Sequence, residues 1–204
     1  MKIVRGIDKA AQILSKIRMS SFESVPPHVQ KVSDSVFGES LSPPQFVNKV
    51  LAEVKIGGDQ AIRSLTKKLD GVTLENLEVS RHDIENAHSN LPYELVESLE
   101  LAAGRVRRFH EATLPKSWID SSEGYGELFN AVNRVGLYIP GGNARFPSTV
   151  LMSAIPARVA GVKEIILATP ASREGLPDPV VLTAADIAGV DRVFQISGAH
   201  AIAA

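Results

Sequence analysis

The chain has 204 residues, a length that allows one or two domains with a buried core. Hydrophobic residues make up 44% of the sequence and charged residues 22%, as in an ordinary globular protein. Its formal net charge is −1, which gives no electrostatic reason to expect nucleic acid or an anionic membrane as a main partner. The sequence contains no cysteine, which excludes disulfides, thiolate metal sites and a cysteine nucleophile within these residues.

The amino-terminal stretch 1–20 has the pattern of an amphipathic helix. It has no apolar core in front of a small-residue cleavage site, as a signal peptide would have. No apolar run in the sequence reaches the roughly 18 to 20 residues that a membrane span requires. The sequence therefore predicts a cytoplasmic protein without a membrane-spanning segment.

Helical periodicity dominates the first 125 residues. Apolar side chains recur at helical spacing from Ile7 to Ile17. A second helix begins at Ser42-Pro43-Pro44, because proline suits the first turn, where its missing N–H is not needed. Gly57-Gly58 is expected to interrupt this helix, Asp59 to cap its continuation and Gly71 to end it.

Three further elements are expected before residue 125. Leu77–Val79 is a candidate for a short strand. Ser80 is a suitable cap for a helix over 81–88, and Pro92 for the start of a long helix to about Ala112.

After residue 126 the pattern changes to alternating strands and helices. In chain order we expect extended segments over 127–132 and 134–139, a helix over 149–160, a strand over 163–169, a helix over 180–188, a strand over 193–196 and a short helix from Gly198. Strands separated by helices of about ten residues predict parallel pairing through βαβ crossovers. The predicted fold class is α/β, with a mainly helical region over 1–125 and a parallel-sheet portion over 126–204.

The end of the sequence predicts an incomplete sheet. Only about three strands are available, and the helix that follows Ser197-Gly198 has about six residues before Ala204. The mostly apolar segment AHAIAA would gain from packing against another surface. The expectation is a fold that is cut short or completed by another chain; the alternative is a short terminal helix docked on its own domain.

One loop is a candidate binding site. The stretch VGLYIPGGNARFPSTV, residues 135–150, places proline and glycines between a strand and a helix. Glycine lets backbone N–H groups approach a ligand, and the helix amino terminus attracts anions. The candidate residues are Tyr138, Pro140, Gly141, Gly142, Ser148 and Thr149, with the last two expected at the helix cap. The spacing matches neither GxGxxG nor GxxxxGK[ST], so a structural turn is the alternative. For Tyr138 taken alone, a half-buried strand residue is the preferred interpretation over a ligand contact.

The histidines offer little further chemistry. His82 and His88 are six residues apart, off the spacing of a shared helical metal site, and are expected on a solvated face. His110 follows several arginines near a helix end and is expected on a solvated or partner-facing surface. His200 follows Gly198 at a strand end, the edge where ligands bind; the alternative is an ordinary helix-start histidine.

Two long stretches, VGLYIPGGNARFPSTVLMSAIPARVAGVKEIILATP and AADIAGVDRVFQISGAHAIAA, closely resemble the histidinol dehydrogenase family. The earlier stretches VLAEVKIGGDQAIRSLTKKLDG and RVRRFHE resemble it as well. The resemblance covers nearly the whole chain, but only about the first half of a typical member. It implies intertwined Rossmann-like α/β domains in a homodimeric oxidoreductase. It also implies zinc-dependent oxidation of L-histidinol to L-histidine, with reduction of two NAD, in histidine biosynthesis.

The resemblance also implies residue roles. The NAD-contacting tyrosine of the family's GLYxPGG run corresponds to Tyr138, and the glutamine of its GGAQAIAA turn corresponds to His200. Imidazole replaces one amide hydrogen bond of glutamine but not the paired donor and acceptor. Ser197 stands where the first glycine of that turn is usual. These departures from the family pattern are expected to affect the affinity for the cofactor more than the fold.

The family's zinc ligands and its Glu-His acid/base pair belong to the half beyond Ala204. The resemblance therefore implies no catalytic and no metal-binding residue in this chain, which is expected to be inactive alone. Its expected partners are histidinol, NAD, and either a second copy or a C-terminal half. The alternatives are a free-standing short homologue that binds a nucleotide or another chain without catalysis, and a scaffold that has lost ligand binding.

Overall fold

The computed structural model describes residues 6–13, 27–141, 144–172 and 175–204, with no side-chain description for 27–29. The chain divides into two compact units, Met1–Ala52 and Glu53–Ala204, which are described separately.

The first unit is helical. It contains a helical segment over 7–13, helix α2 (Pro27–Phe37) and the beginning of α3 (Pro43–Leu69). The Phe37 and Phe46 rings meet edge to face with centroids 5.2 Å apart, which fastens α2 to the start of α3. The first helix was expected to continue to Ile17, but the residues beyond 13 lie outside the described part of the chain. Helix α2 is not among the elements expected from the sequence.

Helix α3 contains the interruption that its glycines predict. Gly58 has φ 51° and ψ −137°, so two helical stretches meet there inside one element. The left-handed region suits glycine, which carries no Cβ to clash with the backbone. The helix ends at Leu69, and Gly71 follows with φ 72°. The predicted start, interruption and end of this helix are confirmed.

The next two helices begin where the sequence predicts. Helix α4 (Arg81–Ser89) is capped by Ser80, whose Oγ accepts a hydrogen bond from the Asp83 N–H at 3.1 Å. Helix α5 (Tyr93–Thr113) follows Pro92 directly. The candidate strand Leu77–Val79 makes only an isolated antiparallel bridge, between Glu78 and Phe194.

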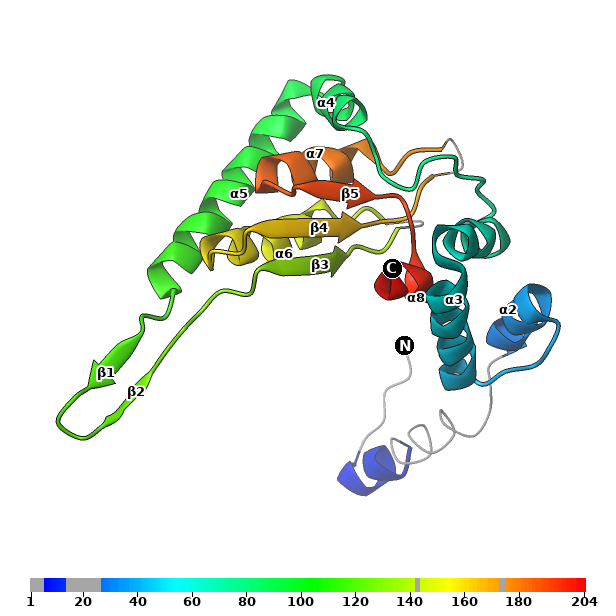
Figure 1. Ribbon diagram of the computed structural model, residues 1–204, viewed down its shortest axis with the longest axis horizontal. Helices are drawn as coiled ribbons and strands as arrows, with labels where there is room; N and C mark the ends of the chain where they lie inside the picture. The colour runs from blue at the N-terminus through cyan, green and yellow to red at the C-terminus, as the bar shows by residue number, and fades with distance from the viewer. Residues whose placement is uncertain (1–5, 14–26, 142–143, 173–174) are drawn as a thin grey trace. The chain divides into compact units, whose positions relative to one another are not determined.

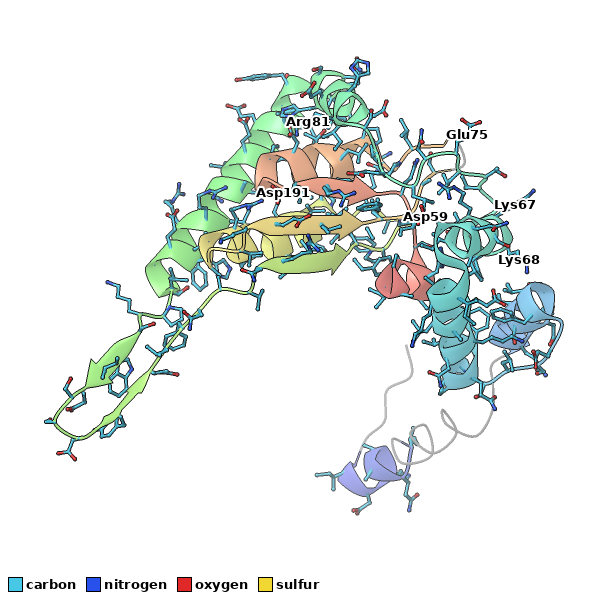
Figure 2. All side chains as sticks on the ribbon, in the orientation of Figure 1. Asp59, Lys67, Lys68, Glu75, Arg81 and Asp191 are labelled. Atoms are coloured by element: carbon cyan, nitrogen blue, oxygen red, sulfur yellow. The ribbon has the colours of Figure 1, made fainter. Side chains whose placement is uncertain are left out.

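Helix α4 is fastened to helix α7 (Pro179–Ala188) through Asp186. Arg81 Nη1 lies 2.7 Å from Asp186 Oδ1, and His88 Nδ1 lies 2.8 Å from Oδ2. Figure 2 labels Arg81 on α4. The expectation that His88 belongs to a freely solvated face is therefore wrong, because tertiary packing brings a carboxylate from a residue 98 positions away to its ring.

A parallel sheet forms the centre of the second unit. Strands β3 (Arg134–Tyr138), β4 (Glu164–Ala168) and β5 (Arg192–Phe194) pair in the order β3-β4-β5, with Val135 opposite Ile165 and Ile166 opposite Arg192. Helices α6 (Pro147–Val159) and α7 connect them, and α8 (Gly198–Ala203) follows β5. Figure 1 shows the three arrowheads at one end of the sheet. The predicted α/β class with a parallel sheet is confirmed.

The segment before β3 differs from the expectation. Strands β1 (Trp118–Asp120) and β2 (Tyr125–Glu127) form an antiparallel hairpin, and 128–132 belong to no strand. Of the expected extended segment over 127–132, only Glu127 lies in a strand, so the expectation is wrong as a strand over 128–132. The hairpin turn is held by Asp120, whose Oδ1 accepts hydrogen bonds from the N–H groups of Ser122 (2.9 Å) and Glu123 (3.1 Å).

The core lies on one face of the sheet. Both crossovers advance in the same direction, so right-handed connections place α6 and α7 on the same face. Ile165 and Leu167 of β4 are fully buried in this core, while Ile166 between them is only partly buried. Helices α4 and α5 pack on α6 and α7 and add Ile84 and Leu99 to the same core. Helices from before and after residue 125 thus share one core. The division into two regions at that residue stays a prediction.

The amino edge of the sheet is closed by Arg158 and Asp191. Arg158 Nη2 donates to the Gly189 carbonyl at 2.6 Å and to Asp191 Oδ2 at 2.7 Å, and the Ile165 N–H donates to the same carboxylate oxygen at 2.7 Å. Burial raises the pKa of Asp191, but these hydrogen bonds more than offset it, so the pKa lies below its usual range. Figure 2 shows Asp191 near the start of β5, at the amino edge of the sheet.

Candidate functional site

A cavity of about 1000 Å³ lies at the carboxyl edge of the parallel sheet. Residues at the ends of all three strands line this cavity. Open α/β sheets usually bind their ligands at this carboxyl edge. The lining residues at the strand ends are Tyr138, the last residue of β3, with Pro140 and Gly141 after it, Thr169, Pro170 and Ala171 after β4, and Ser197 after β5. The charged residues of the wall are Asp70, after α3, and Arg145 and Asp178, in the loops before α6 and α7.

The predicted site residues divide into three groups. Tyr138, Pro140 and Gly141 line the cavity, as the loop pattern favoured. Gly142 lies outside the described residues. Ser148 and Thr149 are not among the lining residues, and they lie in the first turn of α6, not at its cap.

The cap position of α6 belongs to Phe146. The helix begins one residue later, at Pro147, and no side chain caps it by a hydrogen bond. The expected Ser-Thr cap is therefore wrong, because proline takes the first helical position and moves the start of the helix forward. The amino terminus of α6 keeps its partial positive charge without a capping side chain.

Gly141 is required by its neighbour in space. An added Cβ would lie 2.4 Å from Pro170 Cγ, a distance that real Cβ atoms do not tolerate. The loop that follows β3 therefore touches the loop that follows β4 directly. Glycine here makes room for an adjacent loop, a reason that the sequence pattern alone does not reveal.

The two crossover helices differ at their amino termini. Asp178 Oδ1 accepts a hydrogen bond from the Val180 N–H at 2.9 Å, so α7 is capped by its own carboxylate. Asp178 Oδ2 also lies 2.8 Å from Arg145 Nε, in the loop that leads to α6. The start of α7 is thus already neutralised, and a ligand anion would find the start of α6 more favourable.

Asp70 and Ser197 join α3 to the end of β5. The Ser197 hydroxyl lies 2.9 Å from Asp70 Oδ1 and 2.7 Å from Oδ2. Both residues line the cavity. In the sequence, Asp70 lies at a helix end, and no local signal links it to Ser197, 127 positions away.

His200 lies behind this wall. Its side chain is fully buried and its Nε2 lies 3.2 Å from Thr66 Oγ1 and 4.0 Å from Asp70 Oδ2. Burial lowers the pKa of His200, and the nearby Asp70 charge opposes this only in part. The imidazole is therefore neutral in the folded chain near pH 7. His200 is not among the cavity-lining residues, so its role as a cofactor contact stays a prediction.

Replacement of His200 by glutamine is expected to reduce the loss of stability in mild acid. The pKa of His200 is lower in the folded chain than in the unfolded chain. Below about pH 6.5 the imidazole is therefore protonated in the unfolded chain while it stays neutral in the folded chain. The free energy of unfolding of the original chain then decreases as the pH falls, and glutamine removes this contribution. Thermal midpoints measured between about pH 7 and pH 5 for both chains provide the test. Equal pH slopes would contradict the buried, neutral imidazole.

Within the ranges that the structure describes, no three His, Cys, Asp or Glu side chains come together in a way that could hold a metal ion. None of the described helices is both long and apolar enough to cross a membrane.

Comparison with known proteins places the chain in a family. The family model described as histidinol dehydrogenase matches residues 39–204. A histidinol dehydrogenase from Dehalococcoides mccartyi (strain CBDB1) is 42% identical over 207 residues, which cover 100% of this chain and 46% of that protein. A histidinol dehydrogenase from Methanothermobacter thermautotrophicus is 44% identical over 161 residues, which cover 78% of this chain and 38% of that protein.

A solved structure agrees with these relatives. The crystal structure of histidinol dehydrogenase from Elizabethkingia anophelis matches with a TM-score of 0.73 and 31% sequence identity, covering 87% of this chain and 42% of that chain. The present chain thus spans less than half the length of these relatives. Since the family model covers most of the chain and the relatives are over 40% identical, the chain belongs to the histidinol dehydrogenase family of oxidoreductases.

Proposed function

We propose that this chain supplies the dinucleotide-binding part of a histidinol dehydrogenase. The whole enzyme oxidises L-histidinol to L-histidine with reduction of two NAD, in cytoplasmic histidine biosynthesis. The observation that carries the proposal is the cavity at the carboxyl edge of the parallel sheet, in a chain of this family. Its volume of about 1000 Å³ is at the upper end of the range for small-molecule sites, which suits a ligand as large as a dinucleotide.

The residues around the cavity fit NAD. The uncapped start of α6 offers partial positive charge, and the loop after β3 offers a backbone with little side-chain bulk, to the pyrophosphate. Tyr138 offers an aromatic face and a hydroxyl, and Pro140 and Gly141 offer a surface with little bulk. Gly142, Ser148, Thr149 and His200 complete the set that we propose for cofactor binding. NAD, when bound, supplies the hydride acceptor; these residues bind and orient it.

The zinc ion expected for this family does not fit the described residues, because they form no metal-binding cluster. We propose that its ligands and the proton-transfer residues lie in the part of the relatives that this chain does not span. The chain then needs a separate C-terminal half or a longer form of itself, and the assembled enzyme is proposed to be a homodimer. Alone, the chain holds cofactor without turning over histidinol.

A calorimetric titration of the full chain with NAD tests this function. We expect saturable binding of one NAD per chain, and no NADH from histidinol with or without zinc. Addition of a separately produced C-terminal half from a relative is expected to restore NADH formation. The absence of NAD binding would overturn the proposed cofactor site. Turnover by the chain alone would overturn the proposed location of the catalytic residues.

A further inference from the structure

Asp70 lies on the wall of the cavity at the side of β5, opposite the loop proposed for the phosphates. The order β3-β4-β5 separates the ends of β3 and β5 by about 10 Å, at the usual spacing of neighbouring strands. Asp70 contacts Ser197 at the end of β5, and both line the cavity. This separation leaves room for a dinucleotide with its pyrophosphate at the β3 loop to place a sugar beside Asp70.

The Asp70 carboxylate has hydrogen-bonding capacity to spare. Its two oxygens have about four acceptor positions, and the Ser197 hydroxyl has one proton to donate to them. No second hydrogen bond to these oxygens occurs within the described parts of the chain. The Asp70 side chain is 23% exposed, so the remaining positions are accessible from the cavity. A pair of neighbouring sugar hydroxyls matches a carboxylate with free acceptors.

The negative charge of Asp70 is not neutralised nearby. Among the described residues, the one basic group within 4.0 Å is His200, and its burial keeps the imidazole neutral. Arg145, a cation on the same cavity, is paired with Asp178. A phosphate group placed beside Asp70 would therefore meet a like charge in a partly enclosed site.

A purely structural role explains the position of Asp70 poorly. The residue comes immediately after the last residue of α3, where the partial negative charge of the helix terminus disfavours a carboxylate. The single hydrogen bond from Ser197 would equally be made by a neutral acceptor.

We propose that Asp70 binds the ribose hydroxyls of the dinucleotide and selects NAD over the 2′-phosphorylated NADP. Dinucleotide-binding proteins commonly use an acidic residue for the 2′-hydroxyl and a basic one for a 2′-phosphate. The inference rests on the dinucleotide function proposed for the cavity. It goes further by naming the residue that sets cofactor specificity.

The test is a pair of calorimetric titrations, with NAD and with NADP, on the full chain and on Asp70→Asn. The original chain is expected to bind NAD at least about tenfold more tightly than NADP. Asp70→Asn keeps the size of the side chain and an acceptor for Ser197 but removes the charge. It is expected to shrink the NAD-to-NADP affinity ratio by at least about tenfold. The ratio is insensitive to partial unfolding, which lowers both affinities equally.

Two further variants sharpen the test. Asp59→Asn makes the same charge change within α3, at a side chain labelled in Figure 2. This side chain is 73% exposed, and Asp59 is not among the residues that line the cavity. It is expected to leave the ratio unchanged. Ser197→Ala removes the hydrogen bond to Asp70 but keeps the carboxylate, and NAD is expected to remain preferred.

The possible results distinguish a failure of the role inferred for Asp70 from a failure of the proposed NAD site. If the chain binds NAD but the ratio is the same in Asp70→Asn, the inference is overturned and the cofactor site stands. If the chain binds neither nucleotide, both are overturned. A matching change of the ratio in Asp59→Asn would also overturn the inference, because it would point to overall charge.

Discussion

Replacement of Gly141 by valine is expected to abolish nucleotide binding and to lower the thermal midpoint of unfolding. A Cβ alone would lie 2.4 Å from Pro170 Cγ, so one of the two loops that line the cavity must move. Overpacking of this kind costs about 1–3 kcal/mol, and each kcal/mol lowers the midpoint by roughly 2–4 °C in a domain of this size. Titration with NAD and differential scanning calorimetry measure the two effects.

Gly136→Ala is the matched control for this experiment. Gly136 lies in β3, and a Cβ added there meets no atom within 4 Å. We expect it to keep NAD affinity and stability close to those of the original chain. Full-affinity binding by Gly141→Val would show that the loop after β3 does not shape the cofactor site.

Replacement of Leu167 by alanine is expected to cost about 2–5 kcal/mol of unfolding free energy. Leu167 is fully buried in the central strand of the sheet and belongs to the core shared with α6 and α7. The truncation removes buried apolar surface and leaves a cavity that two flanking strands prevent from collapsing. Urea denaturation of the chain and the variant measures the difference.

Ile202→Ala gives the control for Leu167→Ala. Ile202 lies on α8 and its side chain is 69% exposed, so the same loss of apolar atoms is expected to change stability by less than about 0.5 kcal/mol. A loss below about 1 kcal/mol for Leu167→Ala would contradict the placement of β4 at the centre of the core.

The parts of the fold that local chemistry specifies could be predicted from the sequence. Ser80 and Pro92 mark helix starts because a cap or a proline acts within a few residues. The parallel sheet follows from the alternation of apolar strands and helices. The hairpin β1-β2 escaped prediction because its strands are three residues each and its turn depends on the Asp120 side chain.

The candidate site could be predicted only on its β3 side. The loop with Pro140 and Gly141 carries a local pattern, and the structure brings it to the cavity. Asp70 carries no such pattern, because its partner Ser197 is distant in sequence and the pairing depends on the tertiary fold. The burial of His200 against Thr66 has the same origin. Contacts between distant elements are invisible to arguments from periodicity and capping.

The contacts between α3 and the segment after β5 also set the order in which the site is built during synthesis. Thr66 meets His200 and Asp70 meets Ser197 across 134 and 127 positions of sequence. A ribosome must therefore complete nearly all of the sheet before this side of the cavity exists. Contacts of such long range form late in folding, after local helices and hairpins. A nascent chain that has not yet reached β5 has the loop after β3 but not the wall that faces it. A ligand of the proposed cofactor site therefore cannot assist the earlier steps of folding.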